Sequence, residues 1–331
     1  MPHLESALLR WAFEHTSDGM ILTDPTGLIL MANDAFVTMF GYPREEVVGQ
    51  RTGFLRSQYS TDAFYSAMWR SIREHGLVTV CEEAGCPNLS ECWSDGTATF
   101  MVLGERCTRA CGFCLVDTRK PLAPEPDEPE RVAEAVDRMG LKHAVVTMTA
   151  RDDLDDGGAE HIAQTIAAIR LRNPQTAVEV LVSDFHGDRS SIDVVIAARP
   201  DVFNHNLETV ARLQRAVRPS AGYARSLGVL SRARNAGLRT KSGLIVGMGE
   251  TDDEVLAALA DLASIGCGIV TIGQYLRPTS NHLPVDRWVE PSTFERFRRE
   301  GEAMGIGHVE SSPLTRSSYH AREAAGHAIV V

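Results

Sequence analysis

The sequence has no apolar run long enough to cross a membrane and no excess of positive charge. None of its apolar stretches approaches the 18 or more residues of a membrane-spanning helix, and its start lacks the basic and then apolar stretch of a secretory signal. Its formal net charge of −11 is opposite to the concentrated basic surface that phosphate neutralisation requires. We therefore expect a cytoplasmic protein with no role at a membrane or on nucleic acid.

Cysteine is scarce, and its distribution is uneven. Only 7 cysteines occur in 331 residues, none of them in residues 1–76, and all but one lie between Cys81 and Cys114. This density is too low for a disulfide-stabilised secreted domain, and neither group of cysteines supplies the four ligands, often two CxxC pairs, that structural zinc sites prefer. The remaining Cys267 lies in the apolar run SIGCGIV, so we interpret it as a buried structural thiol.

The gathered cysteines form two triplets with different spacings. One follows CxxxCxxC and comprises Cys107, Cys111 and Cys114. The other follows Cx4Cx5C and comprises Cys81, Cys86 and Cys92. Short loops that carry three thiolates are typical of iron–sulfur clusters, because soft thiolates bind iron well and surround one face of a cube. Each triplet therefore predicts a [4Fe–4S] cluster with one iron that lacks a cysteine ligand, and such an iron is where chemistry can start.

CxxxCxxC is the signature of the radical S-adenosylmethionine enzymes, and within that superfamily the chain resembles lipoyl synthases. The resemblance runs from about Val78 to Gly326 and rests first on CEEAGCPNLSEC (81–92) and RSSYH (316–320). Four further segments resemble the family in order and spacing: RDDLDDGGAEH (151–161), VFNHNLETV (202–210), TKSGLIVGMGE (240–250) and GQYLRPTSNHLPV (273–285). Gly112 stands where the family often has proline, and no departure removes a cluster ligand.

The resemblance implies an enzyme that inserts two sulfur atoms into unactivated C–H bonds, at the sixth and eighth carbons of a protein-bound octanoyl-lysine. The cluster of the CxxxCxxC triplet would bind S-adenosylmethionine, whose reductive cleavage yields a 5′-deoxyadenosyl radical. The second cluster would be the sacrificial sulfur source, completed by Ser318, with Ser317 as the competing ligand. The implied partners are octanoylated carrier domains, namely the glycine-cleavage H protein and 2-oxoacid dehydrogenase E2 domains, and an electron donor such as ferredoxin or flavodoxin.

Further cofactor contacts are predicted in three sets: Gly157 and Gly158; Asn204, Asn206 and Glu208; Gly247 and Gly249. The first pair precedes a helix, where bare backbone can approach the methionine end of the cofactor. The middle set alternates along a predicted strand, so its side chains would share one face. The last pair resembles the strand motif that passes the adenine. Each set also has a structural alternative, namely a helix start, polar pairing or a tight strand exit.

From residue 97 onward, strand-like and helical stretches alternate, as in parallel β/α units. Six strands are predicted, at 99–104, 143–148, 178–182, 202–208, 242–248 and 269–276. We therefore expect an α/β fold, a partial TIM barrel of about six β/α units, known as the radical SAM fold. Because reactive groups gather at the C-terminal ends of barrel strands, the CxxxCxxC cluster should lie at the barrel mouth.

Residues 1–76 have another pattern and resemble the first part of a PAS sensor domain. ILTD and LILMAN predict a hairpin around a Pro-Thr-Gly turn, and FVTMF and FYSAMWRSI predict helices. The last three strands of a PAS fold have no counterpart, because the cluster motif begins where they are expected. We therefore expect a small, incomplete α+β PAS-like segment (1–76) and a lipoyl synthase domain (77–331). The latter would hold the auxiliary cluster motif (81–92), the barrel (97–290), and a C-terminal helix with RSSYH (291–331).

Two alternative functions stay open. One is a cluster-based redox sensor with a PAS-like input and an inactive barrel. The other is a different radical enzyme that also inserts sulfur. The sensor predicts clusters without cofactor cleavage. The second alternative does not explain the second cysteine triplet or the RSSYH segment.

Overall fold

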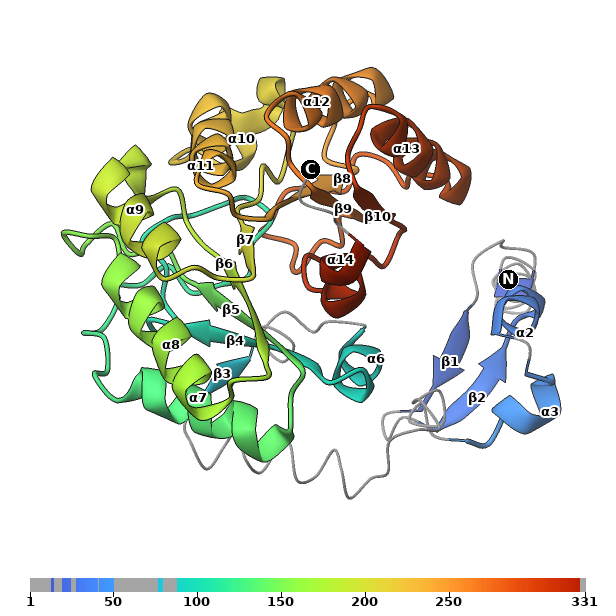
Figure 1. The fold of residues 1–331 in the computed structure, drawn as a ribbon. Helices are drawn as coiled ribbons and strands as arrows, with labels where there is room; N and C mark the ends of the chain where they lie inside the picture. The colour runs from blue at the N-terminus through green and yellow to red at the C-terminus, as the bar shows by residue number, and fades with distance from the viewer. Residues whose placement is uncertain are drawn as a thin grey trace. The chain divides into compact units, whose positions relative to one another are not determined.

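The structure is a computed structural model that describes residues 13–14, 20–24, 28–40, 42–50, 77–79 and 88–327. The chain divides into two compact units, Met1–Ser60 and Thr61–Val331 (Figure 1). Across the described residues, every helix is too short or too polar to cross a membrane.

The described part of the smaller unit contains a hairpin. Strand β1 (Ile21–Thr23) pairs antiparallel with β2 (Ile29–Ala32), and the helices α2 (Asp34–Phe40) and α3 (Arg44–Val47) follow. The buried Asn33 joins these parts, because its Oδ1 accepts hydrogen bonds from two backbone N–H groups, at 2.8 and 2.9 Å. The hairpin and the first helix confirm the sequence prediction. The helix predicted at FYSAMWRSI lies outside the described residues.

The larger unit is organised around one eight-stranded sheet, in the order β10-β9-β8-β7-β6-β5-β4-β3. Its strands are β3 (Val78–Thr79), β4 (Thr97–Val102), β5 (His143–Met148), β6 (Ala177–Leu181), β7 (Val202–Asn204), β8 (Thr240–Val246), β9 (Ile269–Gln274) and β10 (His308–Ser311). All neighbours from β4 to β10 are parallel, and β3 runs antiparallel to β4 at the edge. The arrangement is the predicted α/β fold with helices outside a curved parallel sheet (Figure 1).

Helices alternate with the strands and cover the outer face of the sheet (Figure 1). The longer ones are α7 (Glu128–Met139), α8 (Ala159–Arg172), α9 (Arg189–Ala197), α11 (Tyr223–Asn235), α12 (Asp252–Ser264) and α13 (Pro291–Ala303). Short ones are α6 (Leu89–Ser94), α10 (Gln214–Val217), α14 (Ala321–His327), and the 3-10 turns η2 (Phe185–Gly187) and η3 (Ala211–Leu213). Local signals set their ends: Gly140 stops α7 in a left-handed conformation, and Thr251 with Glu254 forms a capping box before α12.

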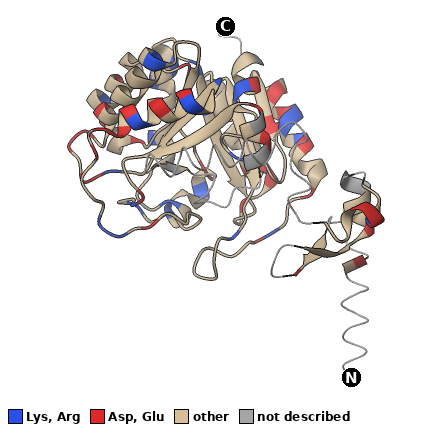
Figure 2. Ribbon diagram, turned by 90° about the horizontal axis from the view of Figure 1, so that it is seen from below, with Lys and Arg blue, Asp and Glu red and all other residues tan. Residues whose placement is uncertain are grey.

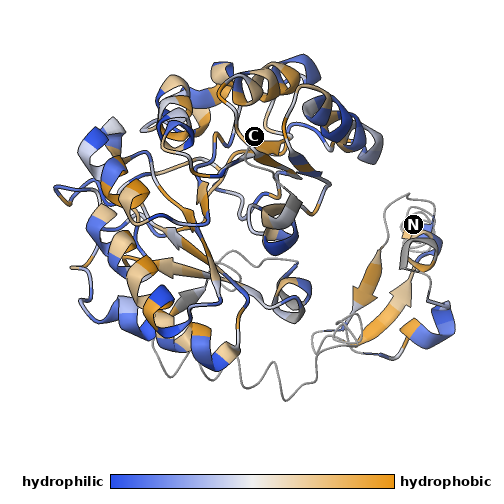
Figure 3. Cartoon of the chain, viewed as in Figure 1, coloured by the Kyte–Doolittle hydropathy of each residue, from blue (hydrophilic) through white to orange (hydrophobic). Residues whose placement is uncertain are grey.

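The two faces of the sheet have different contents. On β4, Ala98, Phe100 and Val102 are buried in the core against the helices, whereas the alternate residues Thr99 and Met101 face a cavity on the inside. Hydrophobic residues line the strands and the inward sides of the helices (Figure 3). Charged residues lie mainly on the helices and loops, while the strands are mostly uncharged (Figure 2). A charge on the inner face of the sheet is therefore an exception.

Several details differ from the predicted strands: β3 was not predicted, and β4 and β8 begin and end two residues earlier than predicted. Strand β7 ends at Asn204, not at residue 208, because the chain leaves regular strand geometry there and Glu208 has a positive φ of 65°. Residues 205–208 still follow β8, since Glu208 N donates to Gly243 O at 2.9 Å. Strand β10 lies in the segment that we expected to hold only a helix and RSSYH. Its four residues, HVES, have one buried side chain, Val309, so they give little strand signal.

Candidate active site

One short loop after β4 carries Cys107, Cys111 and Cys114. Cys107 N donates to Asp117 O at 2.8 Å and Cys114 N donates to Cys111 O at 3.1 Å, so the loop folds back on itself. Thr108 N donates to Ala150 O at 3.0 Å, which ties the loop to the end of β5. All three cysteine side chains are partly accessible. The loop therefore presents three thiols together at the C-terminal end of the sheet, where barrel enzymes hold their reactive groups.

The electrostatics of these thiols suit a bound cation. Burial, with a smaller contribution from the neighbouring thiols of Cys111 and Cys107, raises the pKa of the Cys114 thiol to about 11. Burial likewise raises the pKa of Cys111, against the opposing charge of Arg218. Bound iron reverses this preference, because it stabilises the thiolate form. Within the described part of the chain, no three ligand side chains converge on a single-ion position. Thiols that serve separate corners of an iron–sulfur cube do not need to converge.

Gly112 lets the cysteine loop lie between two other segments. A Cβ on Gly112 would stand 2.7 Å from the Cδ1 atom of Leu283. The backbone is held from both sides, since Gly112 N donates to Val217 O at 2.8 Å and Leu283 N donates to Gly112 O at 3.0 Å. His282 Nε2 lies 3.0 Å from Cys114 O. The departure from proline at Gly112 therefore has a packing reason here.

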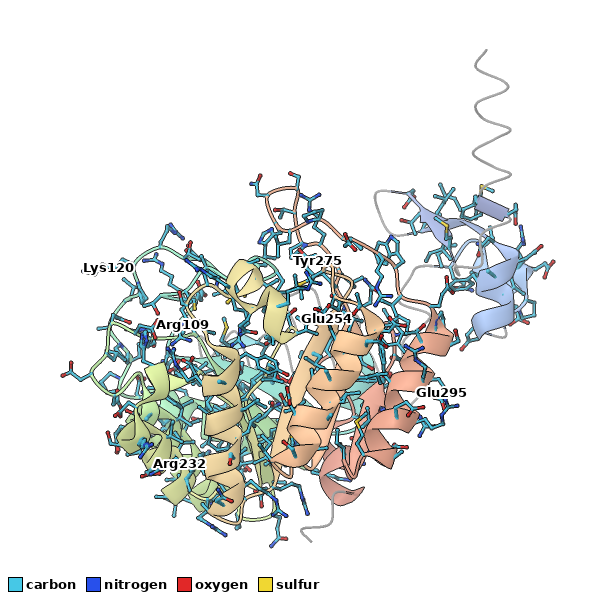
Figure 4. The ribbon with its side chains drawn as sticks, turned by 90° about the horizontal axis from the view of Figure 1, so that it is seen from above. Arg109, Lys120, Arg232, Glu254, Tyr275 and Glu295 are labelled. Carbon is cyan, nitrogen blue, oxygen red and sulfur yellow. The ribbon has the colours of Figure 1, made fainter. Side chains whose placement is uncertain are left out.

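Arg109, inside the cysteine loop, anchors that loop to the next two strand ends. Its guanidinium is buried and contacts both carboxylate oxygens of Asp152 at 2.8 Å and Asp184 Oδ1 at 2.7 Å. Burial alone would raise the pKa of each carboxyl group, but Arg109 outweighs it and lowers the pKa of both. Arg225 also contacts Asp184, at 3.1 Å. Figure 4 shows Arg109 within the larger unit and Lys120 at its outer edge. We had not predicted this residue, although its place between two cluster cysteines was a signal.

A cavity of about 700 Å³ opens beside the cysteine loop on the inner face of the sheet. Its apolar wall comprises Met101, Phe113, Val145, Leu181, Leu244 and Ile245. Its polar groups include Cys114 from the loop, Asn206 and Glu208 after β7, and Ser317 and Ser318 from the RSSYH segment. Leu115 and Leu276 line it and are 50% and 41% exposed, so the cavity reaches the surface near them. Tyr275, labelled in Figure 4, also lines it. The same cavity is therefore lined by residues of the CxxxCxxC loop and of the RSSYH segment, the two motifs identified in the sequence.

Asn206 and Glu208 form the polar corner of this cavity. Asn206 Nδ2 donates to Glu208 Oε1 at 3.0 Å, and Arg218 donates to the carbonyl oxygen of Asn206 at 2.9 Å. Burial raises the pKa of Glu208, against the opposing charge of Arg218 and the Asn206 hydrogen bond. The absence of a side chain at Gly243 makes room, because a Cβ there would stand 2.8 Å from Asn206 Oδ1.

The other predicted cofactor contacts do not line this cavity. Asn204 points to the same inner face but bonds to Glu179 and Ser317. Gly158 begins α8 at a φ of 88°, and a Cβ there would stand 2.4 Å from a Leu103 methyl group. The other glycines of the prediction are Gly157, whose Cβ would meet Phe185 at 3.1 Å, Gly247, whose Cβ would meet Gln274 at 2.3 Å, and Gly249, at a φ of 108°. These glycines have packing or backbone reasons, and their contact with a cofactor stays a prediction.

Helix α6, which carries the buried Cys92, contacts the RSSYH segment. Tyr319 Oη donates to Glu91 Oε2 at 3.1 Å, and His320 Nε2 lies 3.1 Å from Glu91 Oε1. Asn88 Nδ2 donates to Leu314 O at 2.7 Å. Burial and Glu91 raise the pKa of Tyr319, with a smaller contribution from Cys92. These contacts bring Cys92 and RSSYH together. The remaining cysteines of its triplet, Cys81 and Cys86, lie outside the described residues.

The two serines of RSSYH have different surroundings. Ser317 Oγ accepts a hydrogen bond from Asn204 Nδ2 at 3.0 Å and lies 3.5 Å from Asn206 Oδ1. The Ser318 hydroxyl has no hydrogen-bond partner among the described residues, although Ser318 lines the cavity. The segment passes close to β9, since a Cβ on Gly273 would stand 2.0 Å from Thr315 O. Ser317 is therefore engaged by the barrel, and Ser318 is available.

Comparison with known proteins gives two kinds of match. A model of the radical SAM superfamily matches residues 101–262, and a model of the PAS fold matches residues 7–77. A lipoyl synthase of Rubrobacter xylanophilus is 54% identical over 275 residues, which are 82% of this chain and 86% of that protein. A lipoyl synthase of Chlorobaculum parvum is 51% identical over 275 residues, 82% of this chain and 94% of that protein.

Solved structures resemble the fold at low identity. The crystal structure of HydG, a maturase of the [FeFe]-hydrogenase, has a TM-score of 0.53 at 15% identity and covers 82% of this chain and 71% of that one. The crystal structure of Streptococcus suis SuiB has a TM-score of 0.51 at 9% identity, covering 81% of this chain and 59% of that one. These likenesses show the fold alone.

Proposed function

The chain belongs to the lipoyl synthase family of the radical SAM superfamily, and from this membership we propose that it inserts two sulfur atoms into a protein-bound octanoyl-lysine, at the sixth and eighth carbons. One observation carries the proposal. A single cavity with apolar walls is lined both by Cys114 of the CxxxCxxC loop and by Ser318 of the RSSYH segment. Such a cavity suits an alkyl chain that must meet two reactive centres.

We propose that Cys107, Cys111 and Cys114 hold one [4Fe–4S] cluster and that Cys81, Cys86, Cys92 and Ser318 hold the other. When bound, the first would supply the electron that cleaves S-adenosylmethionine, and the second would supply the sulfur atoms. The donor chemistry fits, because cysteine thiols are soft ligands that bind iron as thiolates. The contacts between α6 and RSSYH support the second set, since they bring Cys92 to the serines.

The chain's own residues would bind the substrate and protect the reaction. The apolar wall around Met101, Val145 and Leu181 would take up the octanoyl chain and exclude water. Asn206 and Glu208 offer hydrogen-bonding groups at the cavity edge near the cysteine loop, suited to the polar part of S-adenosylmethionine. Acid–base residues cannot remove hydrogen from unactivated carbon. A catalytic dyad is therefore not required.

The implied partners follow from the substrate. An octanoyl-lysine on a carrier domain, such as the H protein or an E2 domain, would enter beside Leu115 and Leu276, and a ferredoxin or flavodoxin would supply electrons. Because the thiolates need a reducing compartment, we place the enzyme in the cytoplasm. We also propose that residues 1–76 form a PAS-like segment separate from the catalytic domain 77–331, since the PAS fold matches residues 7–77.

The test is mass spectrometry of an octanoyl-lysine carrier peptide after incubation with anaerobically reconstituted protein, S-adenosylmethionine and a reductant. We expect a gain of two sulfurs that is lost in Cys81→Ala, with 5′-deoxyadenosine formed in both proteins. If the unmodified protein cleaves the cofactor but adds no sulfur, the chain is a radical enzyme that acts on a different substrate. Clusters without cleavage would favour a redox sensor with the PAS-like segment as its input.

A further inference from the structure

Within the described residues, the inner face of the sheet holds a buried group of polar side chains to which the proposed chemistry gives no part: Lys241, Glu179 and His143, whose Nε2 lies 3.4 Å from Glu179 Oε2. Lys241 on β8 and Glu179 on β6 both have fully buried side chains, and Lys241 Nζ lies 3.0 Å from Glu179 Oε1 and 3.2 Å from Oε2. The desolvation of such a pair often cancels its attraction, so that apolar residues of similar volume would stabilise the fold equally well. Stability alone therefore does not explain why these two charges lie inside the barrel.

Glu179 determines which way the amide of Asn204 points. A carboxylate only accepts hydrogen bonds, so the amide must turn its N–H₂ group toward Glu179, where Nδ2 lies 3.0 Å from Oε1. The opposite orientation would set Asn204 Oδ1 against a negative charge. The second N–H of the same group then meets Ser317 Oγ at 3.0 Å. Asn204 Oδ1 is left without a partner among the described residues, so Oδ1 does not set the orientation of the amide.

The orientation of the Asn204 amide also determines how the Ser317 hydroxyl forms its hydrogen bonds. Because Ser317 Oγ accepts from Asn204, its own hydrogen is left to donate, and Asn206 Oδ1 is the acceptor at 3.5 Å. Asn206 in turn donates from Nδ2 to Glu208 Oε1 at 3.0 Å. The chain of hydrogen bonds thus runs between two carboxylates, with Ser317 in its middle. A serine hydroxyl that already donates and accepts is poorly placed to become an alkoxide ligand.

We propose that Glu179 and Lys241 are positioning residues that, through Asn204, hold Ser317 inside the barrel and so present the Ser318 hydroxyl to the auxiliary cluster. The inference rests on the proposed function, because it assumes that a cluster on the second cysteine triplet takes a serine ligand. The inference gives a reason why Ser318, and not Ser317, would be the fourth ligand. Ser317 is restrained by a buried charge, whereas Ser318, next to it, keeps its hydroxyl unbonded within the described structure.

The test uses the full chain with Cys107→Ala, Cys111→Ala and Cys114→Ala, so that reconstitution with iron and sulfide loads the auxiliary site alone. After mild ferricyanide oxidation, electron paramagnetic resonance measures the share of [3Fe–4S] cluster, which rises when the fourth ligand is lost. We expect Glu179→Gln with Lys241→Met to raise this share by about threefold, as Ser318→Ala does. The double change removes both charges together, and His143, 3.4 Å from Glu179 Oε2, keeps a polar neighbour in the glutamine.

A combined variant separates positioning from general damage. Added to Ser318→Ala, the pair substitution should change nothing further, because its effect passes through Ser318. The matched control is Ser226→Ala, which removes a buried hydrogen bond of 2.9 Å from His205, next to Asn204 but toward α11. This control should leave the [3Fe–4S] share at the parent value.

Three results would overturn the inference. In one, the pair variant matches the parent while Ser318→Ala raises the signal. In another, the effects of the pair variant and Ser318→Ala add. If the parent itself binds no cluster, the proposed function fails first and this inference with it. Should the pair variant not fold, Ser317→Ala carries the test: it should raise the share equally, and Ser317→Thr, which restores the hydroxyl, should return it to the parent value.

Discussion

One short loop supplies all three thiols of the CxxxCxxC triplet, whereas the proposed auxiliary site depends on the contact of α6 with a segment more than 200 residues further along the chain. Tyr319 and Glu91, which make that junction, are 228 positions apart. Within the loop, Arg109 forms a buried, two-sided contact with Asp152 and Asp184. At the junction, the contacts of Glu91 are half exposed. The comparison indicates that buried charged contacts hold the loop in place, whereas the junction depends on weaker, partly exposed contacts between distant segments.

The largest effect should separate the two sets chemically. We expect Cys107→Ala to lower both S-adenosylmethionine cleavage and sulfur gain by about 10⁴-fold, because residues that act as one unit fail together. Cys92→Ala should abolish sulfur gain alone. Chromatography of 5′-deoxyadenosine and the mass of the carrier peptide measure the two. Cys267→Ala, a buried cysteine in neither set, is the control and should retain both. Two sulfurs added by the Cys92→Ala protein would contradict this assignment.

The second effect concerns the anchor of the loop. Arg109→Leu would leave Asp152 and the fully buried Asp184 without their shared cation, but Arg225 still contacts Asp184, so the cost should be about 3 kcal/mol of unfolding free energy, the lower end for a broken buried pair. Denaturant unfolding measures it, and iron in the first cluster should fall with it. Arg232→Leu, which breaks the exposed pair with Asp193, is the matched control and should leave the midpoint unchanged. An equal loss of unfolding free energy in both variants would show that Arg109 stabilises the fold no more than an exposed ion pair does.

The third effect is a pH dependence of the unfolding free energy that arises from His205, a buried residue influenced by the charges of Asp184 and Arg109. Burial and the charge of Arg218 lower the pKa of His205 from 6.5 to about 4, although Asp184 opposes this. Below pH 6.5 the unfolded chain therefore binds a proton that the folded chain does not, so stability falls as pH falls toward about 4. The loss from this residue should reach about 3 kcal/mol. Denaturant unfolding of the cluster-free protein measures it, and His205→Gln should remove this part of the slope. An unchanged slope in that variant would assign the dependence to other groups.

The smallest effect lies at the junction. Glu91→Gln weakens the contacts with Tyr319 and His320, which are partly exposed, so it should cost only about 0.5 kcal/mol of unfolding free energy. It should nevertheless reduce iron in the auxiliary cluster and leave S-adenosylmethionine cleavage intact. Glu295→Gln, in a surface pair on α13, is the comparison variant. A loss of cofactor cleavage in Glu91→Gln would mean that the two regions are coupled.

The strands could be predicted because each is a short apolar run between turn signals, and a sheet covered by helices needs such runs. The prediction missed β10, whose HVES sequence has one buried residue, and extended β7 beyond Asn204. The anchor Arg109 and the pair Glu179 and Lys241 were missed as well. For Glu179 and Lys241, the signal was a lone charge within the strand sequences AVEVL and TKSGLIV, but a sequence does not say which strands are neighbours.

The sequence by itself determined the chemistry that is local. Three cysteines within one loop, at fixed spacing, must lie close together in any fold that keeps the loop. What only the tertiary structure decided is the meeting of residues from different strands and from the end of the chain. The hydrogen bond of Ser317 to Asn204, the contact of α6 with RSSYH, and the cavity that joins both motifs depend on how the sheet curves and which side chains it turns inward. Contacts of that kind depend on strand order and packing, which no short stretch of residues specifies.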